Sequence, residues 1–189
     1  MSKTILIPIA DGTEELEAIA IIDVLRRAEA DVTVASVGDI AITASRGTKI
    51  TADKLISQCT GLIYDLIALP GGIPGAENLR DSQPLIRLLK EQKERNGCYA
   101  AICAAPAVVL AHHGLLGDLA ATCHPAYSQG IRNQSRMESR VVVDGNCVTS
   151  RGAGTAVEFA LNLVALLYGK EKALQVAGPM LATFELSLP

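Results

Sequence analysis

The chain has 189 residues, of which 49% are hydrophobic, and a formal net charge of −3 at pH 7. This length fits one domain with a sizeable apolar core, so we expect residues 1–189 to form a single domain. No run of Lys or Arg forms a basic stripe and no stretch approaches about 20 apolar residues, which argues against nucleic-acid binding and against a membrane span.

Short apolar strands alternate with helices along the first half of the chain. The pattern predicts strands at Ile5–Ile9 and Val32–Val37, with a helix between them that starts at the Asp11-Gly12-Thr13 turn and runs to about Ala28. Acidic residues in its first turns favour the helix dipole, and they are Glu14, Glu15 and Glu17. An alternation of polar and apolar residues over Ile40–Ile50 indicates a small hairpin or an edge excursion.

The second half continues this alternation. A buried strand at Tyr64–Leu69 ends in Pro70-Gly71-Gly72 and is followed by a helix through Leu85 to about Arg95. The later predicted elements are strands at Tyr99–Ile102, Val141–Val143 and Cys147–Ser150, a helix opened by Cys103-Ala104-Ala105-Pro106, and helices at Ala156–Tyr168 and Lys170–Ala177. The order predicts the α/β class, as a three-layer α/β/α sandwich on a mostly parallel, flavodoxin-like sheet.

The cysteines indicate a reducing environment. There are five of them, an odd and scattered set, which argues against a disulfide framework: Cys59, Cys98, Cys103, Cys123 and Cys147. The first residues run directly into a strand and lack the apolar region and cleavage site of a secretory signal. We therefore expect a cytoplasmic protein.

Cys103 lies at the predicted junction of a strand and a helix, where a nucleophile elbow would lift its side chain clear of the sheet. The small residues Ala101 and Ala105 stand two positions to either side, as such a turn requires. A helix N-terminus would favour the thiolate, and backbone N–H groups there, together with those of Gly71 and Gly72, could form an oxyanion hole. The alternative is that Cys103 is simply a small buried residue, and spacing alone leaves both open.

Several motifs in a fixed order extend this pattern over nearly the whole chain: Asp11 to Glu17, Ser45-Arg46-Gly47, Leu69 to Gly72, Ala100 to Pro106, His124-Pro125 and Thr149 to Gly152. In these motifs the chain resembles the ThiJ/PfpI superfamily, in the branch of the Parkinsonism-associated protein deglycase and its bacterial relatives. The resemblance runs from the first strand to about Pro179, so residues 180–189 form a C-terminal extension that caps the site mouth or frays.

The resemblance implies catalytic roles for three residues. Cys103 would be the nucleophile, Glu17 a protonated carboxyl that donates a hydrogen bond to its sulfur, and His124 an active-site proton carrier. One shared proton is physically reasonable, since a carboxylate beside a thiolate is a pair of like charges. Without the resemblance, Glu17 would be an ordinary acid of a first helical turn and His124 a structural residue.

Other residues at matching positions have binding or structural roles. The backbone at Gly71, Gly72 and Ala104 would bind an oxyanion. Arg46 and Arg151 would form an anion-favouring rim from opposite sides of a homodimer, or else structural salt bridges. The dimer would use the first helix and the 40–50 excursion. Helix capping or structural pairing is expected for Glu14 and Glu15, and a surface or capping role for His112 and His113.

Two departures from the superfamily narrow the chemistry. Protease-like members have a histidine directly after the nucleophile, where this chain has Ala104, which counts against a peptidase. Cys123 stands beside His124 as a resolving thiol or a small strand residue. The spacings Cys98 to Cys103 and Cys123 to His124 do not match a structural zinc site, so no metal is expected.

The resemblance implies a cofactor-free deglycase or glyoxalase that acts on glyoxal, methylglyoxal or their early adducts with proteins and nucleotides. The thiolate would add to the aldehyde. The alternative is a redox-sensing stress chaperone whose cysteine is oxidised to the sulfinic acid.

Overall fold

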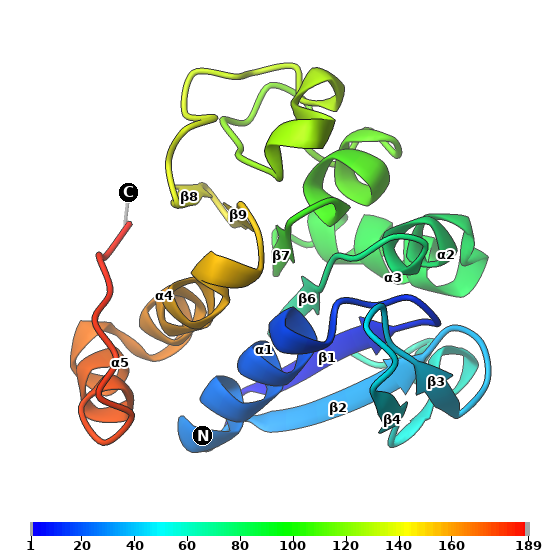
Figure 1. The fold of residues 1–189 in the computed structure, drawn as a ribbon, viewed down its shortest axis with the longest axis horizontal. Helices are drawn as coiled ribbons and strands as arrows, with labels where there is room; N and C mark the ends of the chain where they lie inside the picture. Colours follow the sequence, from blue (N-terminus) through cyan, green and yellow to red (C-terminus); the bar gives the residue numbers. More distant parts are fainter. Residues whose placement is uncertain (1, 188–189) are drawn as a thin grey trace.

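A seven-stranded sheet in the order β5-β2-β1-β6-β7-β9-β8 forms the centre of the computed structural model, which describes residues 2–187 (Figure 1). Neighbouring strands are parallel except for the antiparallel pair β8 and β9. The strands are β1 (Thr4–Ile9), β2 (Asp31–Ser36), β5 (Lys54–Leu55), β6 (Leu66–Leu69), β7 (Cys98–Ile102), β8 (Val141–Asp144) and β9 (Cys147–Ser150). The predicted mostly parallel sheet is thus confirmed.

Helices cover both faces of this sheet, because successive side chains of a buried strand point to opposite faces. In β1, Ile5 and Ile7 pack into a core cluster with α1 and α4, whereas Leu6 packs into a second cluster with α2 and α3. The helices are α1 (Glu15–Arg27), α2 (Gly75–Asp81), α3 (Gln83–Glu94), α4 (Ala156–Tyr168) and α5 (Lys170–Ala177). The three-layer α/β/α sandwich is therefore confirmed.

Two predicted helices differ in detail. The helix expected to run to Arg95 is divided at Ser82 into α2 and α3, because Pro84 has no N–H to continue the hydrogen bonding of α2 but fits the first turn of a new helix. The segment after Cys103 forms a π-helix of six residues, Pro106–Ala111, rather than a regular α-helix. Short 3₁₀ turns occupy Ile56–Cys59, Pro125–Gly130 and Ala153–Thr155.

The excursion at 40–50 is an antiparallel hairpin of β3 (Ala41–Thr43) and β4 (Lys49–Thr51), separate from the main sheet. Main-chain and side-chain hydrogen bonds attach it to the loop after β1. The amide of Gly12 donates to the carbonyl of Thr43 at 2.8 Å, and Thr43 N–H donates to Oδ1 of Asp11 at 2.7 Å. The hairpin turn is thereby held near the carboxyl end of β1.

The C-terminal segment after α5 runs back along α4 (Figure 1). Its side chains alternate, so that Met180, Ala182, Phe184 and Leu186 pack against the core cluster. Asn162 on α4 donates to the carbonyl of Glu185 at 2.9 Å and accepts from Ser187 N–H at 2.8 Å. Up to Ser187 the extension is therefore packed on the domain rather than frayed, and it does not line the pocket that contains Cys103. Residues 188–189 lie outside the described part of the chain.

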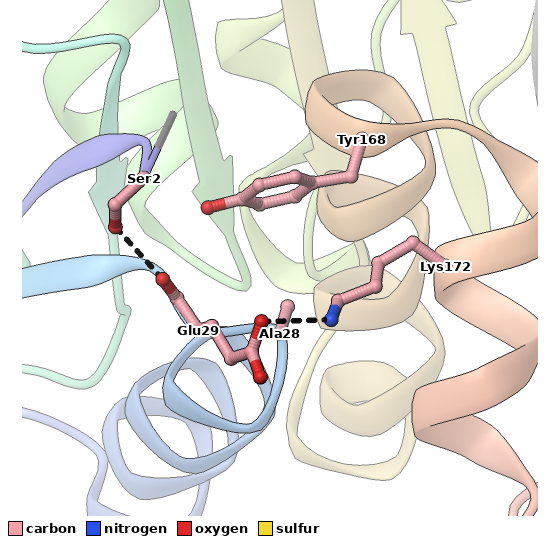
Figure 2. A pocket seen from close by; sticks show the side chains of 5 residues that line it. All are labelled: Ser2, Ala28, Glu29, Tyr168 and Lys172. Atoms are coloured by element: carbon pink, nitrogen blue, oxygen red, sulfur yellow. Dashed lines mark hydrogen bonds and ion pairs between the residues drawn. The ribbon is translucent and has the colours of Figure 1, made fainter.

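A hollow of about 390 Å³ lies where α1 ends and α5 begins, and Figure 2 shows its lining. Lys172 Nζ pairs there with Oε2 of Glu29 at 3.3 Å, and Ser2 Oγ donates to the carbonyl of Glu29 at 2.8 Å. Within residues 2–187, no helix combines the length and apolar character needed to cross a membrane.

Candidate active site

Cys103 directly follows β7 in a strained backbone conformation. Its φ of +64° lies in the left-handed region, which costs free energy for a residue other than glycine. Two hydrogen bonds hold the residue in place. Its N–H donates to the carbonyl of Ser150 at 3.0 Å, and its carbonyl accepts from His124 N–H at 2.8 Å. This geometry is that of a nucleophile elbow, with the thiol partly exposed at the end of the strand.

Glu17, in the first turn of α1, is fully buried beside Cys103. Its Oε2 accepts a hydrogen bond of 2.8 Å from Gly71 N–H, while Oε1 has no hydrogen-bond partner among the described residues. The lack of a side chain at Gly71 makes this approach possible. A Cβ there would lie 2.6 Å from Cβ of Cys103 and 2.9 Å from Oε2 of Glu17.

The two ionisable groups compete for one negative charge. Burial raises the pKa of Glu17 from 4.5 to about 7, although the hydrogen bonds from Gly71 and Cys103 oppose this shift. Burial and the neighbouring Glu17 raise the pKa of Cys103 to about 12, against the backbone N–H groups of Gly72 and Ala104, which favour the thiolate. Burial and the repulsion between two like charges therefore keep the pair from losing both protons near neutral pH.

This result differs from the expectation that the helix terminus alone would favour a thiolate. The π-helix after Cys103 has only six residues, so its aligned peptide dipoles are few. The sulfur is also largely withdrawn from water and faces a carboxyl group. The protonation state of Cys103 therefore depends on Glu17 as much as on the elbow.

A pocket of about 270 Å³ opens over the thiol. Of the residues expected from the sequence, its lining contains Cys103, Gly72, Ala104, Arg46 and His124. The sequence reasoning did not assign the other lining residues to the site: Glu14, Ser45, Ile73 and Tyr127. Glu14 and Ser45 lie within two of the matched motifs, and Ile73 and Tyr127 lie one and two residues beyond the ends of two others, which is the sequence signal for them.

Gly71 and Arg151 do not take their expected positions. Because Gly71 N–H is bound to Glu17, it does not serve an oxyanion, and the donors that face the sulfur are those of Gly72 and Ala104. Arg151 Nη1 forms an ion pair of 3.0 Å with Oε2 of Glu138 and is not part of the pocket lining in the described chain. Within the described chain, Arg151 thus makes the structural pairing that was the alternative to a place on the rim.

His124 lies on the exposed rim of the pocket as the N-cap of the 3₁₀ turn Pro125–Gly130. Its Nδ1 accepts from Ala126 N–H at 3.3 Å, so the neutral ring carries its proton on Nε2. The ring centroid of Tyr127 is 6.1 Å from that of His124. The polar side chains of His124 and Tyr127 therefore lie close together at the edge of the pocket.

The remaining cysteines lie outside this pocket lining. Cys123 is fully buried, and its Sγ donates to the carbonyl of His124 at 3.4 Å and contacts Sδ of Met137 at 4.0 Å. It packs in the second core cluster, whereas Cys103 packs against the first, which fits the small strand residue better than the resolving thiol. Residues 2–187 contain no group of three or more His, Cys, Asp or Glu side chains placed to hold a metal ion.

Comparison with known proteins finds close relatives of the whole described fold. Protein dj-1beta of Drosophila melanogaster is 42% identical over 187 residues, which cover 97% of this chain and 100% of that protein. The glutathione-independent glyoxalase DJR-1.2 of Caenorhabditis elegans is 34% identical over 181 residues, 95% of each chain. The solved structure of Toxoplasma gondii DJ-1, oxidized, matches with a TM-score of 0.94 and 47% identity over 96% of this chain and 100% of that one.

Two plant relatives are longer. Protein DJ-1 homolog B of Arabidopsis thaliana is 52% identical over 174 residues, and the match covers 92% of this chain but 40% of that protein. For homolog A of the same plant, the match covers 44% of the protein. A sequence profile of the DJ-1/PfpI family matches residues 3–166. The chain therefore belongs to the DJ-1/PfpI family.

Proposed function

We propose that this protein is a cysteine-dependent glyoxalase or deglycase that acts, without a cofactor, on methylglyoxal, glyoxal or their early adducts. The observation that carries the proposal is the position of the Cys103 thiol next to the buried carboxyl group of Glu17, beneath a small open pocket. A thiol and a carboxyl group that exchange a proton supply the nucleophile and the acid that aldehyde addition needs. A relative with 34% identity carries the name glutathione-independent glyoxalase, which supports the same class of reaction.

The chemistry begins when Sγ of Cys103 bonds to the aldehyde carbon. The π electrons of the carbonyl move to its oxygen, which takes the proton held by Glu17 and forms a hemithioacetal. In methylglyoxal, a base removes the proton from this carbon and a proton is returned to the neighbouring carbon. The former aldehyde carbon is thereby oxidised to a thioester, and the former ketone carbon is reduced to an alcohol. Water then hydrolyses the thioester to lactate and regenerates the thiol.

Glu17 and His124 are the groups that would move these protons. The buried carboxyl group of Glu17 neighbours Cys103, and His124 lines the same pocket. Backbone N–H groups of Gly72 and Ala104 would stabilise negative charge on sulfur or on the adduct oxygen. Ala104 takes the position of the histidine that protease-like members use, so we do not propose amide hydrolysis.

The proposal is tested by incubating the protein with methylglyoxal in the absence of glutathione and measuring lactate. Cys103→Ala is expected to abolish lactate formation. Cys98→Ser is the matched control, because it changes a cysteine at the opposite end of the same strand. Lactate formation by Cys103→Ala at the wild-type rate would overturn the proposal.

The partial exposure of Cys103 supports a second candidate, a redox-sensing stress protein. Sulfinate oxygens would find donors in the N–H groups of Gly72 and Ala104 and in a protonated Glu17. The relative from Toxoplasma gondii was solved in a form described as oxidized. Mild peroxide treatment followed by mass spectrometry is expected to add two oxygens to Cys103, and an assay of client aggregation should then depend on that oxidation.

A further inference from the structure

One carboxylate holds the hairpin turn that leads to the pocket. Glu15, in the first turn of α1, accepts hydrogen bonds from Ser45 Oγ at 2.9 Å and from Arg46 N–H at 3.0 Å. The amide of Thr48 also points to it, at 3.5 Å. The turn itself is closed by Gly47, whose φ is +93° and whose N–H donates to Ala44 at 2.9 Å. Backbone groups of the turn thus converge on Glu15.

These bonds leave the guanidinium of Arg46 without a partner. Glu15 binds the backbone N–H of Arg46 and not its side chain. The other nearby carboxylate, Glu14, accepts from Glu17 N–H at 2.7 Å as the cap of α1. Within residues 2–187, Arg46 makes no side-chain ion pair or hydrogen bond, yet it lines the same pocket as Cys103. An arginine whose side chain has no partner among the described residues therefore lines the pocket that opens over the thiol.

We propose that Glu15 is a positioning residue that holds the Ser45–Arg46 turn over Cys103, so that the pocket prefers electrophiles carrying a negative charge. The preferred substrates would then be small aldehydes that bear a carboxylate, an inference that rests on the function proposed above. A hydrogen-bond network of this kind acts only while Glu15 is ionised. Although desolvation opposes it, bonds from its own N–H, Ser45, Arg46 and Thr48 lower the pKa of Glu15 to about 2, so the network is present at every pH at which the protein would be assayed.

The test compares the rates at which iodoacetate and iodoacetamide alkylate Cys103 at low ionic strength. Both reagents are small, lose iodide and require the same thiolate, but only iodoacetate is charged. Their rate ratio therefore reports the charge felt at the pocket and cancels any change in the pKa of Cys103. We expect this ratio to fall about 3- to 10-fold in Arg46→Ala, the effect of one nearby charge in a water-rich site. Glu15→Gln should lower it by a smaller factor, because the loss of the carboxylate's own negative charge acts in the opposite direction.

A double-mutant cycle separates positioning from general destabilisation. If Glu15 acts through Arg46, adding Glu15→Gln to Arg46→Ala lowers the ratio no further, because the only remaining effect is the lost negative charge, which raises it. Glu29→Gln is the matched control: it also removes a carboxylate that accepts from a neighbouring group, but at the opposite end of α1 (Figure 2), and should leave the ratio unchanged. Should Glu15→Gln fail to fold by circular dichroism, Ser45→Ala removes one donor of the network and is expected to lower the ratio less.

Two outcomes would overturn the proposal. One is a wild-type ratio in both Glu15→Gln and Ser45→Ala, or in Arg46→Ala. The other is independent, multiplicative effects of Glu15→Gln and Arg46→Ala. Because alkylation requires no turnover of methylglyoxal, a protein without lactate formation can still show the expected ratios. The failure of the proposed function is thereby distinguishable from the failure of this inference.

Discussion

The amide of Gly71 donates a hydrogen bond of 2.8 Å to Oε2 of Glu17 and fixes this buried carboxyl group next to Cys103, while Oε1 has no hydrogen-bond partner among the described residues. This single bond joins the loop after β6 to the first turn of α1. It also explains why the residue at 71 has no side chain, since a Cβ would meet both Cys103 and Glu17. The carboxyl–thiol pair therefore depends on a backbone position that makes no contact with substrate.

Gly71→Ala tests this dependence. The added Cβ would lie 2.6 Å from Cβ of Cys103, so one of the two side chains must move. We expect a loss of about 1–3 kcal/mol in the free energy of unfolding, together with slower alkylation of Cys103. Urea unfolding and iodoacetamide labelling measure the two effects. Gly38→Ala is the control, because a Cβ there has no atom within 4 Å, and equal behaviour of both variants would contradict the prediction.

The stability of the protein should depend on pH through Glu17. Its pKa is raised in the folded state, from 4.5 to about 7, so its contribution to stability is fully present below pH 4.5 and is lost as the pH rises through 7. This shift corresponds to about 3 kcal/mol. Glu17→Gln, which cannot ionise, should gain stability relative to the wild type between pH 5 and pH 8. If the difference in the free energy of unfolding between Glu17→Gln and the wild type stays constant over that range, the pKa of Glu17 is not raised in the folded protein.

The rate at which Cys103 is alkylated should also depend on the ionisation of Glu17. As Glu17 ionises near pH 7, its charge raises the pKa of the thiol, so the rate of iodoacetamide labelling should rise with pH in two steps. In Glu17→Gln the inflection near pH 7 should disappear, leaving the single titration of an isolated thiol. A single titration in the wild-type protein would mean that the two groups ionise independently.

The sequence predicted the sheet and the helices on both of its faces, because both follow from the alternation of apolar strands and helices along the chain. It placed Cys103 and Glu17 after strands whose carboxyl ends meet, which is where the structure has them. The pattern does not predict which groups in distant segments of the chain form hydrogen bonds with each other. Gly71 was expected to bind an oxyanion, but its one N–H is already used by a carboxylate 54 residues earlier in the chain.

Irregular segments were the least predictable part of the chain. Glu138, which forms an ion pair with Arg151, lies in a stretch without helical or strand periodicity. The docking of the C-terminal segment likewise depends on Asn162, a polar residue inside an apolar helix. Its two hydrogen bonds, to Glu185 and Ser187, cannot be predicted from the residues around any of the three. In each case a single side chain decides the position of a segment far away in sequence.

Association of two copies is the remaining expectation, and the outer face of α1 provides the argument for it. Leu16 is 54% exposed and Ile19 is 47% exposed, and together with Val157 and Met180 they line an apolar hollow of about 490 Å³. A symmetric dimer would cover this face with its own copy, since a twofold axis brings the same patch together from both sides.

Ile19→Glu should therefore convert a dimer to a monomer in sedimentation velocity, because it places a charge in the contact. Ile63→Glu, which changes an isoleucine that is 74% exposed on another surface, should leave the mass unchanged. A monomeric wild-type protein at micromolar concentration, or a dimer that survives Ile19→Glu, would rule out this face as the interface.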